Sequence, residues 1–248
     1  MWRYLGSKLD LVLVSEYPKC GATWFCNMLH ELVELPFPRN SFPPLESCVM
    51  QGHHMYNARF NKIIGVIRDG RDVMVSAYYY YLFDNEHHSL RYLFENKLNF
   101  EDYNDVEKNL PIFIEHMFTQ YDQRRSGFTW SEAINSFYDH SSKVHIVKYE
   151  NLLVNPLIEL KAALNFLGFE SRSNEHILSV IEKYSFKTLT NRKQGVEAKN
   201  TFLRKGVSGD WKNKFTKEAC EVFNHYGGKE LIRAGYEKND NWVNSYDN

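Results

Sequence analysis

The sequence predicts an α/β protein with a central, mostly parallel sheet, helices on both faces and a phosphate-binding loop after the first strand. Two observations carry this prediction. Short apolar runs alternate with helical patterns along the chain, as expected of strands joined by crossover helices. The first apolar run leads through a glycine-containing turn straight into a helix. At 248 residues, the chain is long enough for one such domain, which we expect to span residues 1–248.

The first strand is predicted at residues 11–15, where the chain reads LVLVS. The helix that follows, from Ala22 to Leu35, has apolar residues at helical spacing and ends before Pro36 and Pro38. Ser173 and Thr216 are predicted to cap two later helices. Further strands are predicted at residues 48–52, 62–67 and 143–148, and further helices at 71–83, 110–118, 130–140, 156–167, 174–183 and 216–234.

Composition excludes several classes of function. The net charge of −1 argues against a globally basic nucleic-acid binder, so any positive site must be local. The four cysteines show no metal-ligand or disulfide spacing, and reduced thiols indicate a cytoplasmic protein. No signal peptide is apparent, and no apolar run has the length of a membrane span.

The stretch SEYPKCGATWF has the features of an anion-binding turn. A strand, a tight turn at Gly21 and a helix starting near Ala22 or Thr23 direct backbone N–H groups at one point. Lys19 adds a positive charge there. The alternative is an ordinary βα turn with a solvated lysine. The Gly-Lys-Ser/Thr ending of a nucleotide triphosphate loop is absent.

A second candidate is the stretch VIRDGRDVMVSAYYYY. Arg68 closes a strand and Ser76 lies on the next helix, so an arginine and a hydroxyl could hold one phosphate. The alternative is a solvated charge cluster at a helix start, in which Asp72 neutralises an arginine. The members of that cluster would be Arg68, Asp69, Arg71 and Asp72.

A third candidate is the basic loop of Arg204, Lys205 and Gly206 in the C-terminal part of the sequence, which taken alone would be an ordinary solvated surface loop.

Four stretches occur in order along the chain: YPKCGATW, RDGRDVMVS, KYENLLVNP and RKGVSGDWKNKFT. Together they resemble the cytosolic-type sulfotransferases that use 3'-phosphoadenosine 5'-phosphosulfate (PAPS). The resemblance runs from about Leu11 to Thr216.

This resemblance implies transfer of a sulfuryl group from PAPS to a hydroxyl or amine of a small acceptor, leaving 3',5'-diphosphoadenosine (PAP). It implies that Lys19 contacts the bridging oxygen and the 5'-phosphate, and that Trp24 packs against the adenine. Arg68 and Ser76 would hold the 3'-phosphate. The residues implied to bind the nucleotide are Lys19, Cys20, Gly21, Ala22, Thr23, Trp24, Arg68, Ser76, Tyr149, Tyr184, Phe186, Arg204, Lys205 and Gly206.

Some positions depart from the family pattern. Cys20 replaces a serine whose hydroxyl restrains the lysine, and Tyr184 stands where a threonine is common. The dimer motif of the family is partly kept, with Lys217 in place of a valine, so we expect a monomer or a weak homodimer.

The proton of the acceptor needs a base, and a histidine suits this. The family carries one before the Arg–Ser motif, and QGHHMY supplies His53 or His54. The following Tyr56 favours His53. The alternative for each histidine is an inert polar residue at a strand end. His87 and His88 are candidates to line an acceptor pocket.

The resemblance implies in-line transfer, with Lys19 and loop amides stabilising charge on the departing phosphate oxygen and with no metal. Two alternatives remain at this point: a small-molecule kinase with a P-loop-like phosphate-binding turn, and a non-catalytic nucleotide-binding protein. The acceptor is a small molecule with a hydroxyl. Aromatic residues between the motifs suggest a hydrophobic or aromatic alcohol, although they would equally pack in the core.

Overall fold

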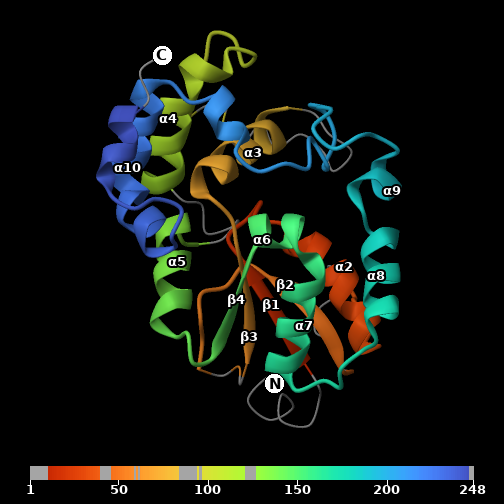
Figure 1. The fold of residues 1–248 in the computed structure, drawn as a ribbon. Helices are drawn as coiled ribbons and strands as arrows, with labels where there is room; N and C mark the ends of the chain where they lie inside the picture. Colours follow the sequence, from red (N-terminus) through yellow and green to blue (C-terminus); the bar gives the residue numbers. More distant parts are fainter. Residues whose placement is uncertain are drawn as a thin grey trace. The chain divides into compact units, whose positions relative to one another are not determined.

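The computed structural model describes residues 11–39, 46–58, 60, 62–83, 94, 97–120 and 127–245. The chain forms two compact units (Figure 1). One, here called the sheet unit, combines Met1–Arg68 with Asn135–Asn191. The other, here called the helical unit, combines Asp69–Ile134 with Arg192–Asn248. The prediction of one domain over residues 1–248 stays a prediction.

The sheet unit contains a parallel sheet of four strands, which confirms the predicted fold class (Figure 1). Its order is β2-β1-β3-β4, so the first strand lies in the middle between its two partners. Val14 of β1 is in register with Gln51 of β2 and with Ile64 of β3. The strands are β1 (Leu11–Glu16), β2 (Cys48–Gly52), β3 (Ile63–Ile67) and β4 (Val144–Lys148).

Helices α2, α6 and α7 pack on the sheet with their apolar residues. Helix α2 packs on β1 and β2, and its Phe25, Met28 and Leu29 are fully buried. Burying a side chain of this size contributes about 1.5–3 kcal/mol. The helices assigned to this unit are α2 (Ala22–Val33), α6 (Tyr149–Val154), α7 (Pro156–Leu167), α8 (Asn174–Lys183) and α9 (Phe186–Thr190).

The helical unit is built around α4 and α10, which pack on each other, with α3 against α4. Helix α5 (Trp130–Asp139) begins in this unit and ends in the sheet unit. No helix in the described part of the chain has the length and apolar character needed to cross a bilayer. The other elements are α3 (Gly70–Leu82), α4 (Val106–Thr119), α10 (Lys217–Arg233) and the 3-10 segments η2 (Asp210–Asn213) and η3 (Asp240–Ser245).

The predicted helix caps are confirmed. The hydroxyl of Ser173 accepts a hydrogen bond from the His176 N–H, and the hydroxyl of Thr216 accepts one from the Ala219 N–H. Each cap satisfies an N–H that the first turn leaves without a partner. Helix α2 ends at Val33, slightly before the predicted end, because Glu34 takes a left-handed conformation ahead of Pro36.

The charged residues at the start of α3 are buried, so the interpretation as a solvated cluster is wrong. The Arg71 side chain is 3% exposed and forms ion pairs with Asp69 and Glu237. Its guanidinium lies 3.7 Å from the ring centroid of Trp211 and 4.6 Å from that of Trp242. Buried charge is tolerated here because it is paired, hydrogen-bonded and stacked on aromatic faces.

Candidate active site

The turn between β1 and α2 has the backbone geometry of an anion-binding loop. Lys19 and Gly21 both take left-handed conformations, with φ of 76° and 98°. A Cβ at Gly21 would lie 2.7 Å from Cδ2 of Tyr149, so this position requires glycine. A left-handed lysine costs on the order of 1–3 kcal/mol, a kind of strain that clusters at functional sites.

Arg68 lies beside this turn in the sheet unit. Its Nη1 donates to the Lys19 carbonyl at 3.4 Å, and its guanidinium carbon lies 4.5 Å from the Tyr149 ring centroid. Trp24 meets the same tyrosine edge to face at 6.0 Å, and its Nε1–H donates to the Tyr184 carbonyl at 2.8 Å. Arg68, Trp24 and Tyr149 therefore meet beside the turn that carries Lys19.

The tyrosine at position 184 is accommodated without its hydroxyl entering the loop. That hydroxyl donates to Glu31 near the far end of α2, which also pairs with Lys183. Burial alone would raise the pKa of Glu31, but the hydrogen bonds from Lys183 and Tyr184 lower this pKa below its usual value. The backbone of Tyr184 keeps the contact with Trp24, and Phe186 begins α9 two residues later.

A buried carboxylate inside the turn was not predicted. Glu16 is 4% exposed, and its Oε2 accepts from the Ala22 N–H at 2.8 Å. Its Oε1 accepts from Nε2 of Gln51 at 2.8 Å, and Oε1 of Gln51 accepts from the Thr23 hydroxyl at 3.0 Å. The available sequence signal was an acidic residue at the carboxyl end of an apolar strand, directly before the glycine turn.

The two candidate base histidines have different surroundings. Nδ1 of His53 lies 3.2 Å from the Glu16 carbonyl oxygen. Because a carbonyl only accepts, this contact assigns the proton to Nδ1 and leaves Nε2 as the basic nitrogen. The backbone of His54 is held by Ser15, and burial together with His53 lowers the pKa of His54.

His87 and His88 lie outside the described residues.

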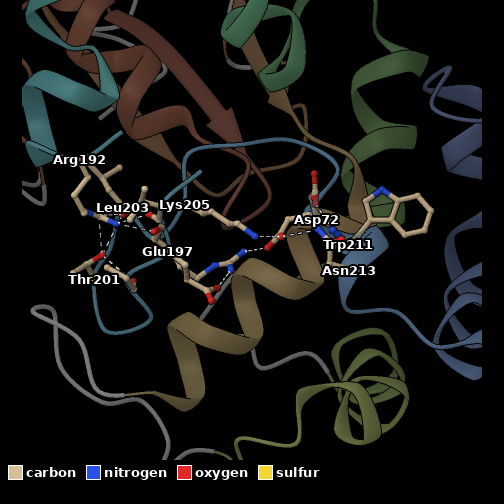
Figure 2. Close-up of polar contacts among 12 residues, drawn as sticks. Asp72, Arg192, Glu197, Thr201, Leu203, Lys205, Trp211 and Asn213 are labelled. Atoms are coloured by element: carbon tan, nitrogen blue, oxygen red, sulfur yellow. Dashed lines mark hydrogen bonds and ion pairs between the residues drawn. The ribbon is translucent and has the colours of Figure 1, made fainter. Parts of the chain in front are cut away.

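In the helical unit, the predicted Arg-Lys-Gly segment is held by carboxylates (Figure 2). Arg204 forms ion pairs with Glu197 and Asp210, and Lys205 pairs with Asp210. Asp210 is buried, which opposes ionisation, but hydrogen bonds from Lys205 and Arg204 lower its pKa below the usual value. The Arg204 guanidinium also stacks on Tyr79, 4.5 Å from its ring centroid.

Helix α3 fixes the turn that carries Asp210. Asp72 accepts from the backbone N–H groups of Gly209 at 2.6 Å and Trp211 at 2.9 Å (Figure 2). Its carboxylate thus ties helix α3 to the backbone of this turn. Ser76 lies one turn further along α3 and is half-buried.

The segment before Arg204 is ordered by a second arginine that sequence analysis missed. Arg192 donates to the carbonyls of Val196, Leu203 and Arg204 (Figure 2). Gln194 donates to the carbonyl of Gly206, which takes a left-handed conformation with φ of 65°. This loop therefore presents Arg204, Lys205 and Gly206 from a hydrogen-bonded frame.

Comparison with known proteins supports the resemblance to sulfotransferases that the sequence motifs indicate. Residues 53–235 match the sulfotransferase domain family. This chain belongs to the sulfotransferase family. It is 25% identical over 261 residues to mouse sulfotransferase 1 family member D1, covering 86% of this chain and 81% of that protein. It is 26% identical to sulfotransferase 1E1 of Cavia porcellus, covering 88% and 82% of the two chains.

Solved structures show the same fold. Mouse sulfotransferase SULT7A1 complexed with PAP superposes with a TM-score of 0.65 at 17% identity, covering 96% of this sulfotransferase and 89% of that chain. Retinol dehydratase, in complex with androsterone and the inactive cofactor PAP, superposes with a TM-score of 0.58 at 16% identity, covering 90% of this sulfotransferase and 80% of that chain. The predicted family and fold class are confirmed.

The ion pairs around Asp210 predict a pH-dependent contribution to stability. Asp210→Asn should lower the free energy of unfolding by about 3 kcal/mol at pH 7, because Arg204 and Lys205 lose a buried partner. The pKa of Asp210 in the folded protein lies below its usual value of 3.8. The stabilisation is therefore complete above pH 3.8 and is lost as the pH falls through the folded-state pKa.

Urea unfolding of both proteins between neutral and acidic pH measures the difference. The matched control is Glu101→Gln, which removes an exposed carboxylate paired with Lys108 and should leave stability nearly unchanged. A stability difference that fails to narrow in acid contradicts the assignment.

Proposed function

We propose that this sulfotransferase takes its sulfuryl group from PAPS, transfers it to a hydroxyl or amine of a small acceptor and releases PAP. The observation that carries the proposal is the meeting of Lys19, Arg68 and Tyr149 at the left-handed turn after β1. A lysine, an arginine and an aromatic face at the start of a helix suit a phosphorylated nucleotide. The PAP complexes among the structural neighbours support the same donor.

The residues present fit such a nucleotide. Lys19 would contact the 5'-phosphosulfate together with the loop from Cys20 to Thr23. The aromatic side chains of Trp24, Tyr149 and Phe186 would contact the adenine, with Tyr184 holding Trp24 through its carbonyl. Arg68 is the proposed ligand of the 3'-phosphate in the sheet unit. The expectation that Ser76, Arg204, Lys205 and Gly206 also bind this phosphate stays a prediction.

The residues of this chain divide the chemistry between them. When bound, PAPS supplies a sulfuryl group on a good leaving group. Lys19 stabilises the charge that develops on the departing phosphate oxygen, as positioned cations do in phosphoryl transfer. His53 takes the acceptor proton at Nε2, because the Glu16 carbonyl keeps the other ring nitrogen protonated. No residue in this scheme requires a metal ion, and the metal-free reaction stays a prediction.

The acceptor is proposed to be a small, largely apolar alcohol. Retinol dehydratase, a structural neighbour, holds androsterone with PAP in one solved structure and retinol with PAP in another. The aromatic content of this chain agrees with an acceptor of that kind. The enzyme is proposed to be cytoplasmic, and to be a monomer or weak homodimer because Lys217 replaces a valine of the family's dimer motif.

Radiolabelled PAPS offered with a panel of phenols, steroids, sugars and lipids tests the proposed reaction. Lys19→Met should lower kcat/KM at least about 100-fold, because charge on the leaving oxygen loses its cation. Its melting temperature should stay close to that of the wild type. The matched control is Lys161→Met on the exposed face of α7, which should leave turnover unchanged. Undiminished turnover in Lys19→Met contradicts its role, and PAP binding without transfer to any acceptor favours a non-catalytic protein.

The two histidines are separable by mutation. His53→Ala should lower kcat about 100-fold or more while leaving PAP affinity unchanged, because only the proton acceptor is lost. His54→Ala should keep activity within a few-fold of the wild type, since its backbone and not its ring is tied to β1. Pre-steady-state sulfuryl transfer and PAP titrations provide the two readouts. The opposite ranking of the two variants assigns the base to His54.

A further inference from the structure

The Glu16 carboxylate has no part in the proposed reaction, which uses only the backbone carbonyl of this residue, yet the carboxylate lies within the turn proposed to hold the 5'-phosphate. The carboxylate accepts from the Ala22 N–H at 2.8 Å, and Ala22 opens helix α2. The start of a helix favours negative charge, so an internal carboxylate there takes the position that suits an external anion. The following inference rests on the proposed function.

Two hydrogen-bond donors of this turn are satisfied by the protein itself. The Ala22 N–H is committed to Glu16, and the Thr23 hydroxyl donates its single proton to Oε1 of Gln51. Gln51 is held in that orientation because its Nε2–H donates to the second oxygen of Glu16. Ala22 and Thr23 are among the residues proposed to bind the 5'-phosphate.

We propose that Glu16 sets the affinity for the nucleotide by competing with its 5'-phosphate. Its carboxylate engages one donor directly and a second through Gln51, and it places negative charge beside the bound phosphate. The burial of Glu16 strengthens this effect because a charge in the interior is weakly screened.

The competition between Glu16 and the 5'-phosphate weakens binding of the product PAP more than binding of the donor PAPS. During transfer the bond between sulfur and the bridging oxygen breaks, and its electron pair stays on the 5'-phosphate oxygen. The sulfuryl group forms its new bond to the acceptor oxygen, and the acceptor proton goes to the base. The phosphate beside Glu16 therefore gains one negative charge, so Glu16 favours release of PAP over retention. Product release limits turnover in many enzymes.

Glu16→Gln tests the proposal because it removes the charge and keeps the shape. An amide at position 16 can still accept from Ala22. Its NH2 group then faces Gln51, whose amide must turn over and release the Thr23 hydroxyl. Calorimetric titrations should use PAP and adenosine 3'-monophosphate, which lacks the 5'-phosphate. We expect PAP to bind at least about fivefold more tightly to the variant, and adenosine 3'-monophosphate to bind within about twofold of the wild type.

Glu34→Gln provides the matched control, because Glu34 caps the other end of the same helix and is exposed. It should change neither affinity. Glu16→Ala removes the carboxylate without adding an amide and should shift PAP affinity in the same direction, which covers the case that Glu16→Gln fails to fold. Circular dichroism and melting temperatures establish which variants are folded.

The outcomes separate this inference from the proposed function. Unchanged or weaker PAP binding by a folded variant overturns the inference alone, and so does equal tightening of both nucleotides, which would show a general charge effect. Failure of the wild type to bind either nucleotide overturns the proposed function and the inference with it.

Discussion

The site depends on one constraint, the left-handed turn that joins the central strand β1 to α2. Gly21 has to be glycine because the Tyr149 ring lies where a Cβ would be. That same ring contacts Trp24 and Arg68, so the turn, the start of α2 and the end of β3 converge on Tyr149. Parallel strands make this possible, since their carboxyl ends lie along one edge of the sheet.

Buried carboxylates hold segments of the candidate site in place in both units. In the helical unit, Asp72 fixes the turn that carries Asp210, and Asp210 in turn holds Arg204 and Lys205. In the sheet unit, Glu16 plays a comparable part within the turn. Each carboxylate satisfies donors that would otherwise be buried without partners. In the helical unit, the protein thus keeps Arg204 and Lys205 in place through its own carboxylates.

Much of the fold followed from local patterns, and the features that were not predicted are very short helices or contacts between distant positions. Apolar periodicity and caps predicted the strands and long helices because both are properties of neighbouring residues. Helices α6 and α9 escaped notice since they have 6 and 5 residues, too few for a period to show. The proposed nucleotide-binding residues came from the order of the sequence motifs. Glu16 and Asp72 did not, because their partners Gln51 and Trp211 lie 35 and 139 positions away.

Hydrogen–deuterium exchange with and without saturating PAP tests most directly the claim that this turn binds the phosphorylated nucleotide. PAP should slow exchange of the amides from Lys19 to Trp24 and leave helix α7 unaffected. ADP with magnesium should give no such protection. PAP binding that leaves the amides of the turn unprotected would contradict the account.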